Sequence, residues 1–183
     1  GQPVKFDTDT QGAIGLPDIS KVLTPGEHKV EVRMTGGSSM PYSVAVNYFN
    51  TKPDSAPECK LSLDVKLNDT ALAEGGITEA QVRVTNTSDE AIPTPVAIVG
   101  IPGGLEVRHD QLKELVKAGK IAAYEVRGRE VVLYWREMAG RQTVELPLSL
   151  VAALPGSYTG PASRAYLYYT DEQKHWVSGL AVR

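Results

Sequence analysis

The sequence Asp110-Gln-Leu-Lys-Glu-Leu-Val-Lys-Ala118 has the pattern of an amphipathic helix of about three turns. It follows the turn signal Ile101-Pro-Gly-Gly-Leu105 and stands alone among β-strand patterns. Asp110 can cap its N-terminus, and Gly119 can supply the left-handed residue that ends it. Its apolar face consists of Leu112, Leu115 and Val116. Because each sheet of a β-sandwich hides one face against the other, a lone helix must cross between the sheets.

Strand patterns surround this helix, as β-branched or aromatic runs with period-two alternation bounded by turn residues. They cover Leu61–Leu67, Ala80–Thr85, Val96–Ile101, Ala123–Val126, Glu130–Arg136, Thr143–Val151, Arg164–Tyr169 and His175–Val182. Val96–Ile101 is nearly all apolar, which is typical of a strand buried on both faces. Residues 59–183 are therefore predicted to form an all-β, antiparallel sandwich with one crossover helix at about residues 110–118.

A smaller β segment is predicted ahead of the sandwich. His28–Met34 and Tyr42–Tyr48 both alternate, and Gly36-Gly-Ser-Ser39 between them indicates a hairpin turn. Residues 50–57 are polar and rich in proline, which is typical of a linker between domains. The predicted domains are thus a β segment over residues 1–52, a linker over residues 53–58 and the sandwich over residues 59–183.

Composition excludes several classes of function. The 183 residues carry 19 basic and 22 acidic side chains, a net charge of −3, with no long run of either sign. This balance gives no reason to expect nucleic acid or an anionic membrane as a partner. No apolar stretch approaches the roughly 20 residues that span a bilayer. Because the chain starts with Gly1 rather than Met, we expect it to be a piece of a longer protein.

The sequence contains no recognisable catalytic, metal or cofactor motif. There is no Gly-x-Ser-x-Gly elbow, phosphate-binding loop or His-Glu-x-x-His helix. His28, His109 and His175 lack the spacing of metal ligands. Cys59 is the only cysteine, so no disulfide forms within the chain, and we expect an inert, buried thiol at the start of a strand. The alternatives for Cys59 are a reactive thiol or pairing elsewhere in a longer protein. No enzyme activity and no cofactor are expected.

The region around the helix resembles the C-terminal receptor-binding domain of the α2-macroglobulin family, which includes thioester complement proteins. The residues that follow the family spacing are Gly104-Leu105, Lys113, Leu115, Glu125-Val126 and Val131-Val-Leu-Tyr134. Downstream, Ala165-Tyr-Leu-Tyr-Tyr-Thr-Asp171 looks like the family signature Val-Tyr-Asp-Tyr-Tyr-Glu-Thr-Asp. It departs from that signature at Leu167, where the family has Asp, and it lacks the Glu.

Residues 1 to about 50 resemble the second half of the CUB-type domain that precedes the receptor-binding domain in that family. The similar segments are Leu23-Thr-Pro-Gly-Glu27, the two alternating runs and Tyr48-Phe49-Asn50. In the family this CUB domain is split by an inserted thioester domain. The resemblance implies a macroglobulin-type β-sandwich preceded by a partial CUB-like segment with unpaired strand edges.

What the resemblance implies about function is a non-catalytic module of a broad-spectrum protease inhibitor. Such a protein traps a protease after bait cleavage and bonds to it through an internal thioester. The Cys-Gly-Glu-Gln thioester motif is missing here, and Glu58-Cys-Lys-Leu-Ser62 is not one, so covalent capture would belong to upstream sequence. The implied partners are upstream thioester and macroglobulin domains and, through the whole protein, target proteases. The implied location is extracellular, or periplasmic if the protein is bacterial.

The resemblance also suggests an interaction site on the helix. In animal members, two lysines one helical turn apart contact an endocytic receptor. The second matches Lys113, while His109 stands at the position of the first, and Arg108 and Lys117 are neighbouring cations. His is mostly neutral at pH 7, so half of such a contact would be lost, which favours a bacterial homologue without that receptor. The alternative interpretation is that these are ordinary solvated charges on an amphipathic helix.

An aromatic group offers a second function. Tyr166, Tyr168, Tyr169 and Trp176 could line the sugar-binding face of a carbohydrate-binding or adhesive sandwich. In a strand, however, Tyr166 and Tyr168 share one face and Tyr169 points to the opposite one. Core packing with one exposed ring is therefore the competing expectation.

Overall fold

The computed structural model describes residues 14–16, 18–37 and 39–183, and the chain divides into two compact units after Val46. In the described part of the first unit, the regular structure is a single 3₁₀ turn, η1 (Ser20–Val22). The second unit contains the sandwich.

The hairpin predicted from residues 28–34 and 42–48 is absent, because neither run forms a strand. Apolar side chains of both runs are exposed, including Val30, Val32, Val44 and Val46. An isolated two-stranded hairpin is at best marginally stable in water, since its apolar face needs further strands or a packed neighbour. The alternation in the sequence therefore shows that these two runs could form strands, but in the described residues they have no strand partner.

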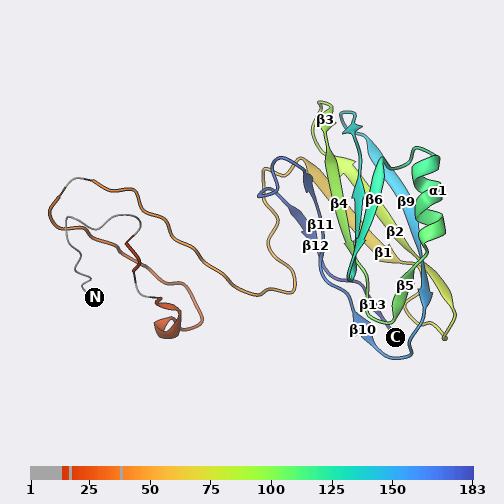
Figure 1. The fold of residues 1–183 in the computed structure, drawn as a ribbon, viewed down its shortest axis with the longest axis horizontal. Helices are drawn as coiled ribbons and strands as arrows, with labels where there is room; N and C mark the ends of the chain where they lie inside the picture. The colour runs from red at the N-terminus through yellow and green to blue at the C-terminus, as the bar shows by residue number, and fades with distance from the viewer. Residues whose placement is uncertain (1–13, 17, 38) are drawn as a thin grey trace. The chain divides into compact units, whose positions relative to one another are not determined.

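Two antiparallel sheets make up the sandwich (Figure 1). The four-stranded sheet has the order β1 (Leu61–Leu67), β2 (Ile77–Asn86), β9 (Thr143–Ala152) and β5 (Leu105–Val107). The five-stranded sheet has the order β12 (His175–Val177), β11 (Ser163–Leu167), β4 (Pro95–Gly100), β7 (Glu130–Tyr134) and β6 (Ala123–Arg127). The expected all-β, antiparallel sandwich is thus confirmed.

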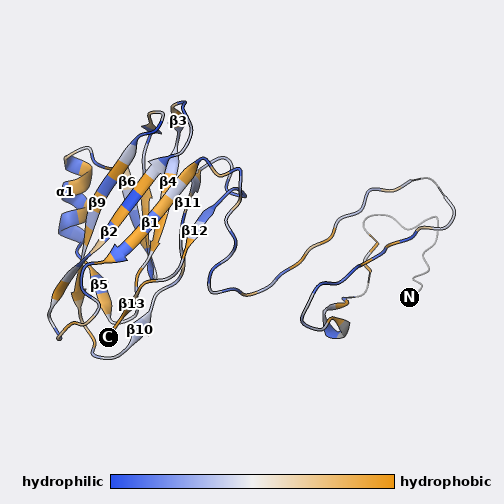
Figure 2. Ribbon diagram, turned by 180° about the vertical axis from the view of Figure 1, so that it is seen from behind, coloured by the Kyte–Doolittle hydropathy of each residue, from blue (hydrophilic) through white to orange (hydrophobic). Residues whose placement is uncertain are grey.

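The core lies between the two sheets. Figure 2 shows polar and apolar residues alternating along β1 and β2, as a half-buried strand requires. Fully buried residues from both sheets meet there, among them Leu63, Val82, Val84, Val99, Leu133 and Leu148. The predicted strand at residues 96–101 is also correct, because every residue of β4 is buried.

The predicted last strand, residues 175–182, is divided in two by the packing of Gly179. β12 ends at Val177 and β13 (Ala181–Val182) pairs instead with β10 (Tyr158–Thr159). A side chain at Gly179 would collide with the backbone carbonyl of Gly160, so the two segments cross there at close range. A second short pair that the sequence did not indicate joins β3 (Ile92–Pro93) to β8 (Glu137–Met138).

Candidate interaction surfaces

Helix α1 (His109–Lys117) connects β5 of the four-stranded sheet to β6 of the five-stranded sheet, so the predicted crossover is confirmed (Figure 1). The predicted N-cap is wrong: Arg108 occupies the cap, without a side-chain hydrogen bond, and Asp110 lies within the first turn. A carboxylate there interacts favourably with the helix dipole. The C-terminal end is as predicted, with Gly119 at φ +67°. Gly119 N–H donates to Val116 O and Lys120 N–H donates to Leu115 O, which is a Schellman motif.

Two residues on its inner side fix the orientation of α1. Leu112 is completely buried in the core. Gln111 reaches the edge of β9, where Nε2 donates to the carbonyl of Pro147 at 3.0 Å and Oε1 accepts from Ser149 N–H at 2.8 Å. The N and C=O of one strand residue point to the same side, so the nitrogen of Pro147, which has no hydrogen to donate, also faces the helix. The pairing of β9 with β2 therefore loses no hydrogen bond at Pro147. The Gln111 amide thus continues the ladder that β5 leaves unfinished.

Replacing Gln111 with alanine is expected to lower the free energy of unfolding by about 1–2 kcal/mol. Two partly buried backbone groups of β9 lose their partner, while alanine is at least as good a helix former as glutamine. Chemical denaturation would measure the loss. The control is Lys113→Ala on the exposed side of α1, where we expect a change of about 0.5 kcal/mol or less. Equal effects of the two substitutions would contradict this role for Gln111.

The four residues predicted as an interaction face, Arg108, His109, Lys113 and Lys117, are all exposed. His109, Lys113 and Lys117 succeed one another at a spacing of four, so they form one row along the helix. The His109 ring lies 6.4 Å from that of Tyr124 on β6, measured between centroids. None of the ion pairs within the described part of the chain uses any of the four. His109, Lys113 and Lys117 thus share one solvent-facing row, Arg108 precedes that row at the N-cap, and a role for them in binding stays a prediction.

A second surface, which the sequence analysis did not identify, is the outer face of the five-stranded sheet. Val96, Ile98 and Val132 lie on this face, yet they are only 1%, 6% and 2% exposed. They form an apolar cluster separate from the main core, with the rings of Tyr134 and Tyr166 packed against it. An outer sheet face normally meets water, so long side chains of neighbouring strands must cover this cluster.

Those covering side chains pair with one another. Arg164 binds Glu130 through two hydrogen bonds, of 2.6 and 3.2 Å, and its guanidinium lies 5.2 Å from the centre of the Trp176 ring. Tyr134 donates to Glu125 at 2.9 Å. The hydrogen bond from Arg127, followed by that from Tyr134, lowers the pKa of Glu125. The result is a surface that contains Tyr, Trp and Arg side chains, residue types that are enriched in protein interfaces.

The four aromatic residues considered for sugar binding do not lie on one strand face. Tyr166 and Trp176 belong to the outer face just described, where Lys174 lies 5.1 Å from the centre of the Tyr166 ring. Tyr168 and Tyr169 lie beyond the end of β11 in a turn, with their rings at 5.2 Å in a T-shaped arrangement. The expectation that Tyr166 and Tyr168 share a strand face is therefore wrong, because the strand ends at Leu167. Both turn residues are exposed, Tyr169 by 81%.

Cys59 and the possible metal ligands are further groups that could carry chemistry. Cys59 is half-buried rather than buried, its Sγ lies 3.3 Å from Leu61 O and 3.7 Å from Ala165 O, which share its one proton, and burial raises the pKa of the thiol. Within the described residues there is no cluster of His, Cys, Asp and Glu that could hold a metal ion. Nor does any helix in those residues have the length and apolar character to cross a membrane.

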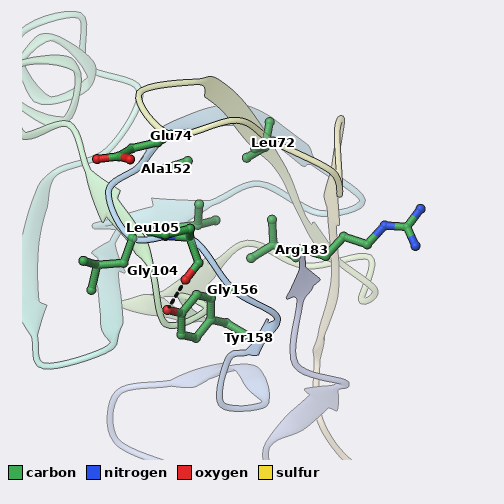
Figure 3. A pocket seen from close by; sticks show the side chains of 11 residues that line it. Leu72, Glu74, Gly104, Leu105, Ala152, Gly156, Tyr158 and Arg183 are labelled. Atoms are coloured by element: carbon green, nitrogen blue, oxygen red, sulfur yellow. Dashed lines mark hydrogen bonds between the residues drawn. The ribbon is translucent and has the colours of Figure 1, made fainter.

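A small pocket lies at the end of the sandwich beside β10 and β13 (Figure 3). Its lining includes Leu72, Leu105, Val182 and the ring of Tyr158, whose hydroxyl donates to the carbonyl of Pro155 at 2.9 Å. Its internal volume of about 20 Å³ is enough for about one water molecule. It is too small for a substrate or cofactor.

Comparison with known structures shows the fold of this chain in bacterial alpha-2-macroglobulins. Trypsin-activated alpha-2-macroglobulin from Escherichia coli matches 71% of this chain with a TM-score of 0.53 and 15% identity. Native Escherichia coli alpha-2-macroglobulin, spanning domain MG7 to the C-terminus, matches 72% with a TM-score of 0.52 and 18% identity. Salmonella alpha-2-macroglobulin reacted with methylamine matches 72% with a TM-score of 0.52 and 19% identity.

These matches cover 10%, 24% and 9% of the three larger chains, so this chain spans a small part of each. No protein-family model matches the sequence, and no curated relative matches it. At identities below 20% the likeness establishes the fold, and the resemblance inferred from the sequence is confirmed at that level.

Proposed function

We propose that this chain is the non-catalytic C-terminal module of an α2-macroglobulin-like, broad-spectrum protease inhibitor. The observation that carries the proposal is the sandwich with its single crossover helix, which has the fold of structures from bacterial alpha-2-macroglobulins. A module of this kind binds upstream thioester and macroglobulin domains and acts on proteases only through the whole protein. Its location would be extracellular or periplasmic, and residues 1–52 would complete a CUB-like domain with strands supplied from upstream.

The experiment is made on the parent protein isolated from its native source. Peptide mapping and intact mass give its full sequence, and methylamine labelling detects a thioester. We expect a long chain with a Cys-Gly-Glu-Gln motif upstream, labelled by methylamine before protease treatment and no longer labelled afterwards. A parent of about this chain's own length would overturn the proposal. A long parent without the motif would reduce it to a relative that lacks the thioester.

The helix face is proposed as one of the surfaces through which the module binds its partners. Lys113 and Lys117 are then expected to react with an amine-acetylating reagent about tenfold more slowly in the parent than in the isolated 183-residue chain, because an interface excludes solvent. Lys66 on the four-stranded sheet, whose side chain is 75% exposed, provides a control. Equal rates for Lys113 and Lys117 in both proteins would identify them as ordinary solvated charges.

A carbohydrate-binding sandwich is the second candidate, and one observation favours it: the exposed pair Tyr168 and Tyr169. Two rings in a turn can stack on a sugar, whereas Trp176 is already partly covered by Arg164. Screening the chain on a glycan array tests this function. Selective binding that is lost in Tyr168→Ala and Tyr169→Ala would support it, and an array without selective binding would remove it.

A further inference from the structure

The segment that enters the sandwich is tied to the free edge of the five-stranded sheet. We call residues 52–59 the strap. Ala56 N–H donates to the carbonyl of Lys174 at 2.9 Å, and Trp176 N–H donates to Ser55 Oγ at 2.8 Å. Since β12 is the edge strand of its sheet, the strap supplies partners for backbone groups that would otherwise face water. The strap thus behaves as an irregular extra strand.

His175 stands where the strap, β12 and β1 meet. Its Nδ1 accepts the backbone N–H of Leu63 at 3.3 Å. Leu63 belongs to β1, the edge strand of the four-stranded sheet, whereas His175 belongs to the edge strand of the other sheet. At the end of the strap, Cys59 Sγ lies between Leu61 O of β1 and Ala165 O of β11, the strand paired with β12. We call this junction of β1 and β12 the seam.

The hydrogen bond to Leu63 exists only while the His175 ring is neutral. A ring nitrogen that accepts carries no proton, so the proton of the neutral ring is on Nε2. Protonation would place an N–H at Nδ1, facing the N–H of Leu63, and would leave two donors without an acceptor.

We propose that His175 is an acid-sensitive latch of the seam, so that protonation of its ring separates β12 from β1 and releases the strap. The groups that face His175 favour release. Two groups of the strap lie near the ring. The Lys52 ammonium is charged and repels a protonated ring, and the Cys59 thiol is titratable but neutral. From β1 the ring meets the Leu63 N–H, and from β11 its backbone partner is Ala165. No carboxylate is among the groups that perturb the ring.

The direction of the pH dependence follows from the environment of the ring. Burial, followed by the charge of Lys52, lowers the pKa of His175 below its ordinary value of 6.5. Above about pH 6.5 the ring is neutral in both folded and unfolded chains, and its contribution to stability is complete. As the pH falls below that value, the unfolded or locally opened chain takes up the proton first, so stability is lost until the folded pKa is passed. Local opening of the seam hydrates the ring without unfolding the sandwich.

Amide hydrogen exchange of the whole chain tests the latch at about pH 7 and about pH 5, the range over which histidine changes charge. After correction for intrinsic exchange, we expect protection at Ala56, Leu63 and Trp176 to fall about tenfold in the wild type at the lower pH. In His175→Asn the amide oxygen takes the place of Nδ1 and does not titrate, so the fall should disappear. His109→Asn, a change at an exposed histidine, should behave like the wild type.

Either of two results would overturn the proposal: no fall in the wild type, or an equal fall in His175→Asn. If His175→Asn does not fold, nuclear magnetic resonance of the wild type decides. The His175 ring should then titrate below pH 6.5, and the Leu63 amide proton should shift along the same curve. A Leu63 amide that does not respond would overturn the latch. The inference does not depend on the protease-inhibitor proposal, because both measurements use this chain alone.

Discussion

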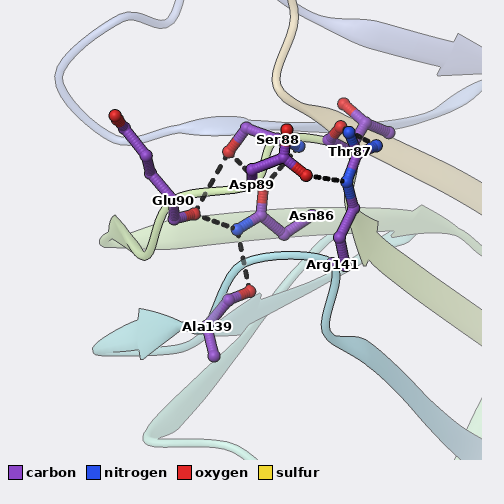
Figure 4. A network of polar contacts seen from close by, with 7 residues as sticks. All are labelled: Asn86, Thr87, Ser88, Asp89, Glu90, Ala139 and Arg141. Carbon is purple, nitrogen blue, oxygen red and sulfur yellow. Dashed lines mark hydrogen bonds and ion pairs between the residues drawn. The ribbon is translucent and has the colours of Figure 1, made fainter.

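Substitution of Asn86 by alanine is expected to lower the free energy of unfolding by about 3 kcal/mol, because this fully buried side chain holds two loops together. Its Nδ2 donates to Glu90 O at 2.7 Å and to Ala139 O at 2.8 Å (Figure 4). Its Oδ1 accepts from the backbone N–H of Ser88 at 2.9 Å and from the Ser88 hydroxyl at 2.7 Å. Alanine removes these four hydrogen bonds and leaves a gap where the fully buried side chain stood.

The two loops that Asn86 joins are connected by this buried side chain and by the exposed residue Arg141. Residues 87–91 lead from β2 to β3, and residues 139–142 lead from β8 to β9. Arg141 donates its backbone N–H to Ser88 O at 2.9 Å and its Nη1 to Thr87 O at 2.5 Å, and its side chain also binds that of Asp89 at 2.7 Å. Both of these side chains are mostly exposed, and such ion pairs contribute little to stability. Losing Asn86 therefore removes the buried part of the connection between the loops and leaves the exposed part.

Equilibrium denaturation would measure the effect, with Asn68→Ala as the matched control. Asn68 is exposed, and its backbone N–H donates to Glu79 O, so loss of its side chain should change stability by about 0.5 kcal/mol or less. A loss at Asn86 no larger than that at Asn68 would show that water replaces the network.

Asn86→Asp gives a further check: its carboxylate would face carbonyl oxygens, so this variant should be more stable at low pH than at neutral pH.

Elements with a strong local pattern were predictable from the sequence. β1 has the predicted bounds, and the helix was placed to within about one residue, because alternation or helical spacing continues to the turn residues at each end. The N-cap was missed for a physical reason. The backbone of Arg108 is already engaged with Ser149 O on β9, so the helix begins where the ladder of β5 ends rather than at the best capping side chain.

Features that depend on pairing between distant strands could not be predicted. The apolar run at residues 96–101 indicated burial on both faces but not what covers its outer side, which is Tyr134, Tyr166 and the Arg164–Glu130 pair. Those contacts follow from the register of β4 with β7 and β11, in which Arg164 lies opposite Ile98. The absent hairpin shows the converse: alternation gives residues 28–48 the capacity to form strands, but pairing requires a partner surface.

Gly100→Ala is expected to be as disruptive as the loss of Asn86, by about 3 kcal/mol, although it adds only one methyl group. Gly100 ends β4, and a Cβ there would overlap the backbone carbonyl of Pro161. A backbone atom cannot rotate away, so the chain before β11 would have to move, and with it the hydrogen bond from Gly100 N–H to Ser163 Oγ at 2.9 Å.

The control separates this steric cost from the conformational cost of replacing any glycine. Gly128 has φ +57° and open space where a Cβ would lie. Alanine there should therefore lower the free energy of unfolding by about 1 kcal/mol, through the strain of the left-handed backbone alone. Gly100 has an ordinary negative-φ strand backbone, so the whole cost of alanine there comes from the steric overlap. Denaturation of both variants should rank Gly100→Ala as clearly the less stable protein. Equal losses would mean that the segment at Pro161 yields easily, and that β4 and β11 are not held at this close approach.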